Sequence, residues 1–138
     1  MSLEYPFEYA DIEGLGRLFY PIIHVGIKTI FGWQDFEFLV DTGADITTVP
    51  SHLLTVLGLK KSELRVSSTL GVSGFNVKTW EFKLQLRIGK KELEASASAV
   101  DTKYDSIALL LGRKDIFEDQ FNLLLDSRKK VTIISENT

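Results

Sequence analysis

The chain has 138 residues, of which 44% are hydrophobic and 25% charged, and its 16 Lys and Arg against 19 Asp and Glu give a net charge of -3. This length suits one domain of about 100–200 residues, and the composition supports a sizeable core and argues against disorder. No basic cluster exceeds Arg128-Lys129-Lys130, so binding to nucleic acid is poorly supported, and the lack of cysteine excludes disulfides, thiol nucleophiles and thiolate metal sites.

The first sixteen residues are acidic and aromatic, and we predict that 1–16 form an N-terminal extension to a domain at 17–138. They contain no cationic segment or long apolar run, and therefore do not resemble a signal peptide. No later apolar stretch approaches the roughly 20 residues of a membrane span. We expect a cytoplasmic protein without a membrane partner. The acidic extension also gives slight support to a chain that is one domain of a longer protein.

Short apolar runs separated by turn residues at roughly 8–12 residue spacing predict a mainly β fold, either a sandwich or a small barrel. A first hairpin is predicted from a strand at Phe19 to Ile30, a turn at 31–34 and a returning strand at Phe36 to Val40 that ends against Asp41. A second hairpin joins Lys78 to Ile88 with Glu92 to Val100 through Gly89-Lys90. Apolar residues alternate along its first strand, as expected of a half-buried strand.

Two short helices and a final hairpin complete the predicted elements. Ser51 to Leu57 is predicted as a helix with an N-cap serine and a closing Gly58, and Arg113 to Asp119 as a second helix after Gly112. The final hairpin pairs Phe121 to Asp126 with Val131 to Ile134. The runs Phe38-Leu39-Val40 and Leu109-Leu110-Leu111 each lead toward a glycine, which indicates a weak internal repeat.

The segment with the clearest chemistry begins at Asp41-Thr42-Gly43. A carboxylate directly after three apolar strand residues lies at the mouth of a core, where it is partly withdrawn from water. The Thr42 hydroxyl can bond neighbouring backbone, and Gly43 allows close approach of another chain. The triplet by itself is also ordinary turn chemistry. The apolar strand before it and the downstream echo favour an acid/base site.

Three motifs occur in the order and at spacings compatible with one family. Phe38 to Thr48, including Ala44, resembles the active-site loop of retropepsins, the retroviral-type aspartic peptidases; Leu70 to Lys78 resembles their flap, with Gly71, Val72, Ser73, Gly74 and Phe75 at its centre; and Leu109 to Arg113 resembles the segment that enters their C-terminal helix. The resemblance extends from about Tyr20 to Asp126. It implies a single-lobe closed β-barrel of the acid-protease type with one or two short helices.

The resemblance also implies a mechanism in which two aspartates share a proton and activate water, with no cofactor or metal. Only Asp41 is followed by Thr-Gly, so a homodimer is required and each subunit supplies one Asp41. The resemblance implies that Thr42 bonds across the two-fold axis, that Gly43 presents its carbonyl to a peptide or protein substrate, and that Asp45 and Arg113 form an ion pair. Ala44 and Ile46, with Val72 and Phe75 of the flap, are expected to line the cleft.

Some features differ from the viral pattern or carry little functional signal. Three features differ from the viral pattern and look more like a cellular or prokaryotic member: the N-terminal extension, the residues after 126 and a longer stretch between Pro21 and Asp41. We expect the dimer interface to be built differently from that of the viral enzymes.

His24 and His52 have no spacing typical of metal ligands, and Trp80 and Phe82 are predicted to be core residues rather than pocket walls. The alternative function is a non-catalytic peptide-binding or dimerisation module on the same fold.

Overall fold

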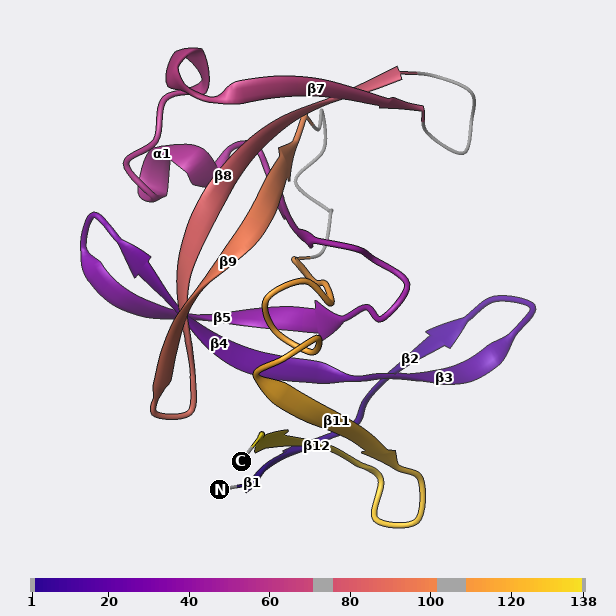
Figure 1. The fold of residues 1–138 in the computed structure, drawn as a ribbon. Coiled ribbons are helices and arrows are strands. Elements are labelled where there is room, and N and C mark those ends of the chain that lie inside the picture. Colours follow the sequence, from indigo (N-terminus) through magenta and orange to yellow (C-terminus); the bar gives the residue numbers. More distant parts are fainter. Residues whose placement is uncertain (1, 71–75, 102–108, 138) are drawn as a thin grey trace.

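The computed structural model describes residues 2–70, 76–101 and 109–137, which are mostly strands (Figure 1). The short helices are α1 (Leu53–Val56) and a 3-10 turn at Lys61–Glu63. The strands are β1 (Ser2–Pro6), β2 (Glu8–Ile12), β3 (Gly16–Tyr20), β4 (Ile22–Thr29), β5 (Gly32–Val40), β6 (Thr47–Pro50), β7 (Arg65–Leu70), β8 (Asn76–Ile88), β9 (Lys91–Val100), β10 (Leu110–Leu111), β11 (Phe121–Asp126) and β12 (Val131–Glu136).

Six strands form a closed barrel. Their order is β4-β5-β10-β6-β9-β8, and a short pairing of β4 with β8, Gly26 opposite Arg87 and Ile27 opposite Leu86, closes the ring. β7 extends the sheet beyond β8. The barrel confirms the predicted fold class. Its core contains the apolar positions of β8, which alternate with exposed or half-exposed neighbours as predicted: Phe82, Leu84, Leu86 and Ile88.

The two apolar runs that suggested an internal repeat lie next to each other in the barrel. β10 pairs parallel with the end of β5, placing Leu110 opposite Leu39 and Leu111 opposite Val40. On its other side, β10 pairs antiparallel with β6 through Leu110 and Thr48. β10 therefore separates β5 from β6, and the loop that joins those two strands must pass over its end. That loop contains the Asp-Thr-Gly triplet.

The two chain ends meet in a separate three-stranded sheet. β1 pairs antiparallel with β12, from Ser2 opposite Ser135 to Pro6 opposite Val131, and β12 pairs with β11 as the predicted final hairpin. β2 and β3 form a two-stranded sheet of their own, which projects away from the barrel in Figure 1. Residues assigned to an N-terminal extension thus supply β1, β2 and the start of β3.

The first predicted hairpin needs two corrections. The strand expected at Phe19 to Ile30 is divided at Pro21, which has no N–H for a continuous ladder, so that β3 and β4 are separate. The turn lies at residues 30–31 rather than 31–34, because Gly32 has a φ of 95° and already begins β5. The Thr29 hydroxyl fastens this turn by donating to the Gly32 carbonyl oxygen at 2.8 Å. The second hairpin, turning at Gly89-Lys90, is confirmed.

The helix predictions are only partly correct. Arg113 is a bend and residues 114–120 form successive turns rather than a helix, because Asp115 has a φ of 67°, in the left-handed region. The helix expected at 51–57 is reduced to α1, with His52 rather than Ser51 at its N-cap position. Gly58, at a φ of 75°, closes it as predicted. Within the described residues, no helix is long and apolar enough to cross a membrane.

Candidate active site

Asp41 follows the last residue of β5 and is fixed by backbone contacts on both sides. Its N–H donates to the Leu111 carbonyl oxygen at 3.0 Å, which ties it to β10. The preceding N–H, that of Val40, donates to the Pro21 carbonyl oxygen at 2.9 Å. Asp41 is partly exposed while Val40 is buried. The carboxylate therefore stands at the edge of the core on a rigid strand end, as the sequence predicts.

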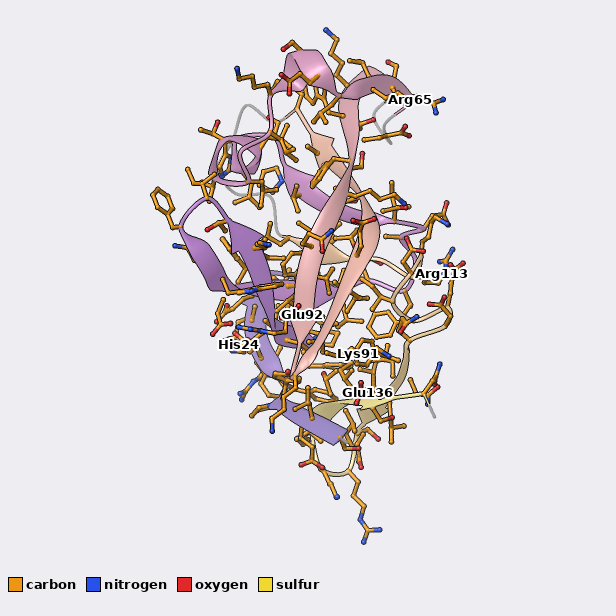
Figure 2. The ribbon with its side chains drawn as sticks, turned by 60° about the vertical axis from the view of Figure 1, so that its left-hand side comes forward. His24, Arg65, Lys91, Glu92, Arg113 and Glu136 are labelled. Atoms are coloured by element: carbon orange, nitrogen blue, oxygen red, sulfur yellow. The ribbon has the colours of Figure 1, made fainter. Side chains whose placement is uncertain are left out.

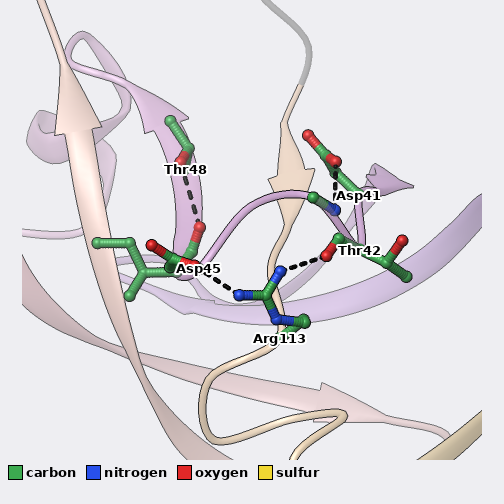
Figure 3. Close-up of polar contacts among 7 residues, drawn as sticks. Asp41, Thr42, Asp45, Thr48 and Arg113 are labelled. Atoms are coloured by element: carbon green, nitrogen blue, oxygen red, sulfur yellow. Dashed lines mark hydrogen bonds and ion pairs between the residues drawn. The ribbon is translucent and has the colours of Figure 1, made fainter. Parts of the chain in front are cut away.

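The loop at residues 41–46, here called the Asp41 loop, orients this carboxylate. The Gly43 N–H donates to Asp41 Oδ1 at 3.0 Å (Figure 3). The Ala44 N–H donates to the Asp41 carbonyl oxygen at 3.1 Å. A Cβ at Gly43 would lie 3.3 Å from Asp41 Oδ1, so glycine allows this close turn. The loop holds one carboxylate oxygen by a backbone donor, which is a preorganised arrangement for acid/base chemistry.

Arg113 braces the Asp41 loop from outside. Its guanidinium donates to the Thr42 carbonyl oxygen and, at 2.5 Å, to Asp45 Oδ1, which is the ion pair predicted from the sequence (Figure 3). The Arg113 N–H also donates to the Ala44 carbonyl oxygen at 3.1 Å. The side chains of Arg113 and Asp45 are 43% and 89% exposed, so the pair contributes little net stability. Its importance lies in the geometry that it gives the loop.

A second brace lies beneath the loop and was not predicted as part of the site. The Gly112 N–H donates to the Thr47 hydroxyl at 3.1 Å, a buried hydrogen bond. A Cβ at Gly112 would stand 2.5 Å from the Ile46 carbonyl oxygen and 2.8 Å from the Thr47 nitrogen. Only glycine permits so close an approach of the two segments. The sequence signal for this contact was Gly112 itself, the glycine that follows the second apolar run.

A pocket of about 360 Å³ adjoins the loop and includes two of the residues expected to line the cleft, Ala44 and Ile46. Its other walls, which sequence reasoning missed, come from β8 and β9 through Val77, Thr79, Ser98 and Val100. β7 and β8 pair antiparallel up to Leu70 opposite Asn76, on either side of the predicted flap. Gly71, Val72, Ser73, Gly74 and Phe75 lie outside the described residues. Trp80 and Phe82 are buried core residues as predicted, although Phe82 also borders a neighbouring pocket.

Asp115, which lies two residues after Arg113, has a shifted pKa. The Ser96 N–H donates to Asp115 Oδ2 at 2.9 Å, and this hydrogen bond lowers the pKa of Asp115 below its ordinary value.

Both histidines are exposed, and Figure 2 shows His24 at the opposite edge of the molecule from Arg113. In residues 2–70, 76–101 and 109–137, no group of three or more His, Asp or Glu side chains is placed to hold a metal ion.

The family model described as aspartyl protease matches residues 28–114, a span that contains the Asp41 loop and ends just after Arg113. The chain belongs to the aspartyl protease family. A retropepsin-like aspartic protease from Rickettsia conorii has the same fold at a TM-score of 0.60 and 20% identity, over 94% of this chain and 98% of that one. EIAV protease, complexed with the inhibitor HBY-793, matches at a TM-score of 0.53 and 21% identity, over 68% of this chain and 82% of that one. No curated protein sequence matches.

Proposed function

We propose that the chain is a homodimeric aspartic endopeptidase in which Asp41 from each of two subunits forms the catalytic pair. The observation that carries this proposal is the Asp41 carboxylate, which is partly exposed at a strand end and oriented by the Gly43 N–H at 3.0 Å. Membership of the aspartyl protease family and the retropepsin-like fold support it.

The need for a second subunit follows from the number of suitable carboxylates. The sequence has one Asp-Thr-Gly triplet, and its Asp105-Ser106 and Asp126-Ser127 pairs are not followed by glycine. In a two-fold dimer, the same surface of each subunit faces the axis, so Asp41 meets its own copy there. Thr42, which is exposed on the loop, is then available to bond to the other subunit's loop.

The proposed reaction is hydrolysis without a covalent intermediate. Two close carboxylates cannot both ionise easily, so they share one proton. The ionised Asp41 removes a proton from water, and the water oxygen attacks the scissile carbonyl carbon while the protonated Asp41 donates to the carbonyl oxygen. On collapse of the tetrahedral intermediate the C–N bond breaks: the Asp41 that took a proton from water passes it to the leaving amine, and the other Asp41 regains its proton from a hydroxyl of the intermediate, which leaves the carboxylic acid. Arg113 acts as a positioning residue because it contacts the Asp41 loop rather than the reacting atoms.

The expected substrate is an extended peptide. The pocket beside the loop lies between residues 44–48 and the strands β8 and β9, where a peptide strand can bond through its backbone. Ala44, Ile46, Val77 and Val100 give this pocket an apolar lining, which favours apolar side chains next to the cut. The Gly43 carbonyl is proposed to accept a hydrogen bond from the peptide. No cofactor is required by this chemistry.

The test is cleavage of a quenched fluorescent peptide library between pH 4 and 7, with and without a statine-type inhibitor. We expect Asp41→Asn to reduce cleavage by about 100-fold or more, because it removes the acid/base group. Asp126→Asn is the matched control, since the Asp126 carboxylate accepts turn hydrogen bonds from the backbone N–H groups of Arg128 and Lys129 and asparagine keeps an acceptor oxygen. A folded dimer that cuts nothing would contradict the proposal and favour a peptide-binding module.

A further inference from the structure

The hairpin of β2 and β3, residues 8–20 and here called the arm, has little support within its own chain. It forms a two-stranded sheet separate from the barrel and extends away from it (Figure 1). Its packing includes Phe19 stacked on Phe7 with ring centroids 4.2 Å apart, and Arg17 over the Tyr9 ring at 4.3 Å. An isolated two-stranded hairpin is marginally stable in water. The arm therefore needs a further surface to pack against.

The two faces of the arm differ in what they already contact. Directly opposed residues of paired strands share a face, so Tyr9, Phe19 and Arg17 lie on the face that makes the aromatic contacts. The other face carries Ala10 opposite Leu18, with Ile12 further along, and Leu15 follows at the turn. Ile12, Leu15 and Leu18 are 37%, 70% and 36% exposed. This second face therefore exposes apolar side chains to solvent, as does the first, where Tyr9 and Phe19 are 40% and 43% exposed.

The C-terminal end of the arm lies close to Asp41, the proposed catalytic residue. β3 leads through Pro21 into β4, and the Pro21 carbonyl oxygen accepts from the N–H of Val40, the residue before Asp41. Figure 1 shows the arm and the loop after β5 on the same side of the barrel. A second copy that brings its own Asp41 to this one must approach from that side. The arm is therefore continuous with the proposed dimer interface.

Charge and shape indicate where the arm would dock on the second copy. The arm carries Glu8, Asp11 and Glu13 against Arg17 alone. A pocket of about 410 Å³ beside the Asp41 loop has Ile46, Phe82 and Ala97 among its apolar walls and is bordered by Arg65, Lys83 and Lys114, with Glu81 already paired to Arg65 at 3.4 Å. Lys114 Nζ lies 4.0 Å from Asp115 Oδ1, so the pocket border has a net positive charge through Lys83, which contacts only the neutral Ser96 hydroxyl among the interactions of the described residues. An apolar, acidic hairpin complements an apolar pocket with this net positive charge.

We propose that the arm clasps a second copy of this chain, with Leu15 and Leu18 packed on that copy's pocket and Glu13 facing its Lys114. This inference rests on the proposed function, because the second copy is the one that completes the catalytic pair. The arm then stabilises the dimer in addition to any contact made by the Asp41 loops themselves. Each copy contributes one arm and one pocket, as a two-fold interface requires.

The first test measures the dimer dissociation constant of the full chain by sedimentation equilibrium. We expect Leu15→Glu and Leu18→Glu to raise this constant by at least about tenfold, because each places a charge in the apolar contact. The matched control is Phe31→Glu in the β4–β5 turn, which is 74% exposed and lies outside the arm, and it should leave the constant within about twofold. Arm variants that dimerise like the wild type would overturn the inference.

Two further measurements do not depend on those variants. Lys114→Glu should weaken the dimer, and Glu13→Lys added to it should restore most of the loss, because the pair then regains opposite charges. Hydrogen exchange at amides 8–20 should slow as the protein concentration rises through the dissociation constant. Amides that exchange equally fast in monomer and dimer would contradict the clasp, and so would a charge swap that restores nothing.

The proposed contact of the arm and the proposed peptidase activity can be disproved independently. A dimer that cleaves peptides and is insensitive to the arm substitutions overturns only the clasp. A dimer that depends on the arm and cuts nothing supports the clasp and overturns the peptidase. A chain that remains monomeric at every concentration overturns both.

Discussion

The Asp41 loop and the arm start from the same place in the barrel and are supported very differently. The loop is held by hydrogen bonds from Asp41 to Leu111, from Arg113 to Ala44 and Thr42, and from Gly112 to Thr47. The arm is held by its own ladder and the Phe7–Phe19 stack. One chain thus braces the Asp41 loop on several sides but leaves exposed the arm, which we propose contacts a second copy.

This contrast has a functional consequence for the proposed peptidase. A carboxylate whose orientation is set by a folded loop needs no rearrangement when the second one arrives. Assembly of the dimer then becomes the step that controls activity, because a single subunit has only one Asp41. Changes in the loop braces should damage each assembled site, whereas changes in the arm should reduce the number of assembled sites.

The largest effect is expected from Gly112→Ala, which should disrupt the close packing that holds the Asp41 loop and so remove its advantage over the arm. The new methyl group would stand 2.5 Å from the Ile46 carbonyl oxygen and 2.8 Å from the Thr47 nitrogen, both of them backbone atoms. We expect a loss of about 3 kcal/mol or more in the free energy of unfolding, measured with urea, together with loss of cleavage.

Gly26→Ala is the control for that substitution. Its Cβ would meet the Arg87 side chain at 3.4 Å, which is an ordinary contact. The stability of this variant should stay within about 1 kcal/mol of the wild type. Equal stabilities of the two alanine variants would show that the segments at Gly112 and Ile46 are not fixed by their close approach.

The next effect concerns Arg113→Lys, which separates loop geometry from overall stability. Lysine lacks the fork that reaches both the Thr42 carbonyl oxygen and Asp45 Oδ1. We expect kcat/KM for a peptide to fall by about 10- to 100-fold, because a small misplacement of the Asp41 loop has a large effect on rate. Unfolding should change by less than about 1 kcal/mol, since the pair is exposed.

Arg128→Lys provides the comparison, since Arg128 is exposed in the turn between β11 and β12, where its backbone N–H donates to Asp126 Oδ1 at 3.0 Å, and it contributes to neither pocket beside the Asp41 loop. It should change the free energy of unfolding by less than about 0.5 kcal/mol and kcat/KM by less than about twofold. A similar loss of activity in both variants would argue against a specific role for Arg113.

The residues that sequence reasoning placed correctly are those whose signal is local. The alternation of Phe82, Leu84, Leu86 and Ile88 predicts a strand because one face of the sheet is buried. The position of Asp41 follows from the apolar run before it. The pairing of Asp45 with Arg113 came from a family resemblance, since 68 residues separate them.

The features that were missed depend on contacts between distant segments. The helix predicted at 113–119 is broken at Asp115, a turn residue whose carboxylate accepts a hydrogen bond from the Ser96 N–H of strand β9. The pairing of β1 with β12 joins opposite ends of the chain, where neither sequence contains a turn or motif that specifies it. Thr79 and Ser98 line the pocket because β8 and β9 cross beside the loop, which no local pattern records.

A moderate effect is expected from Thr47→Val, which tests the inner brace alone. Valine has nearly the same shape but cannot accept from the Gly112 N–H, leaving a buried donor without a partner. We expect a loss of about 1–3 kcal/mol in the free energy of unfolding. Thr47→Ser, which keeps the hydroxyl, should recover most of it, and equal losses in the two variants would mean that the methyl group rather than the hydrogen bond matters.

The smallest effect is expected from Asp115→Asn and appears as a change in pH dependence. The Ser96 N–H lowers the pKa of Asp115 in the folded protein, so its ionised form stabilises the fold above the unfolded pKa of about 3.9 and this contribution is lost as the pH falls through the folded value. Asparagine tolerates the left-handed φ of 67° and keeps an acceptor oxygen, but it does not titrate. The melting temperature of the variant should therefore lie roughly a few degrees below that of the wild type at pH 6, and the gap should narrow below pH 4. A gap that stays constant from pH 6 to pH 3 would show that the charge of Asp115 does not stabilise the turns beside the Asp41 loop.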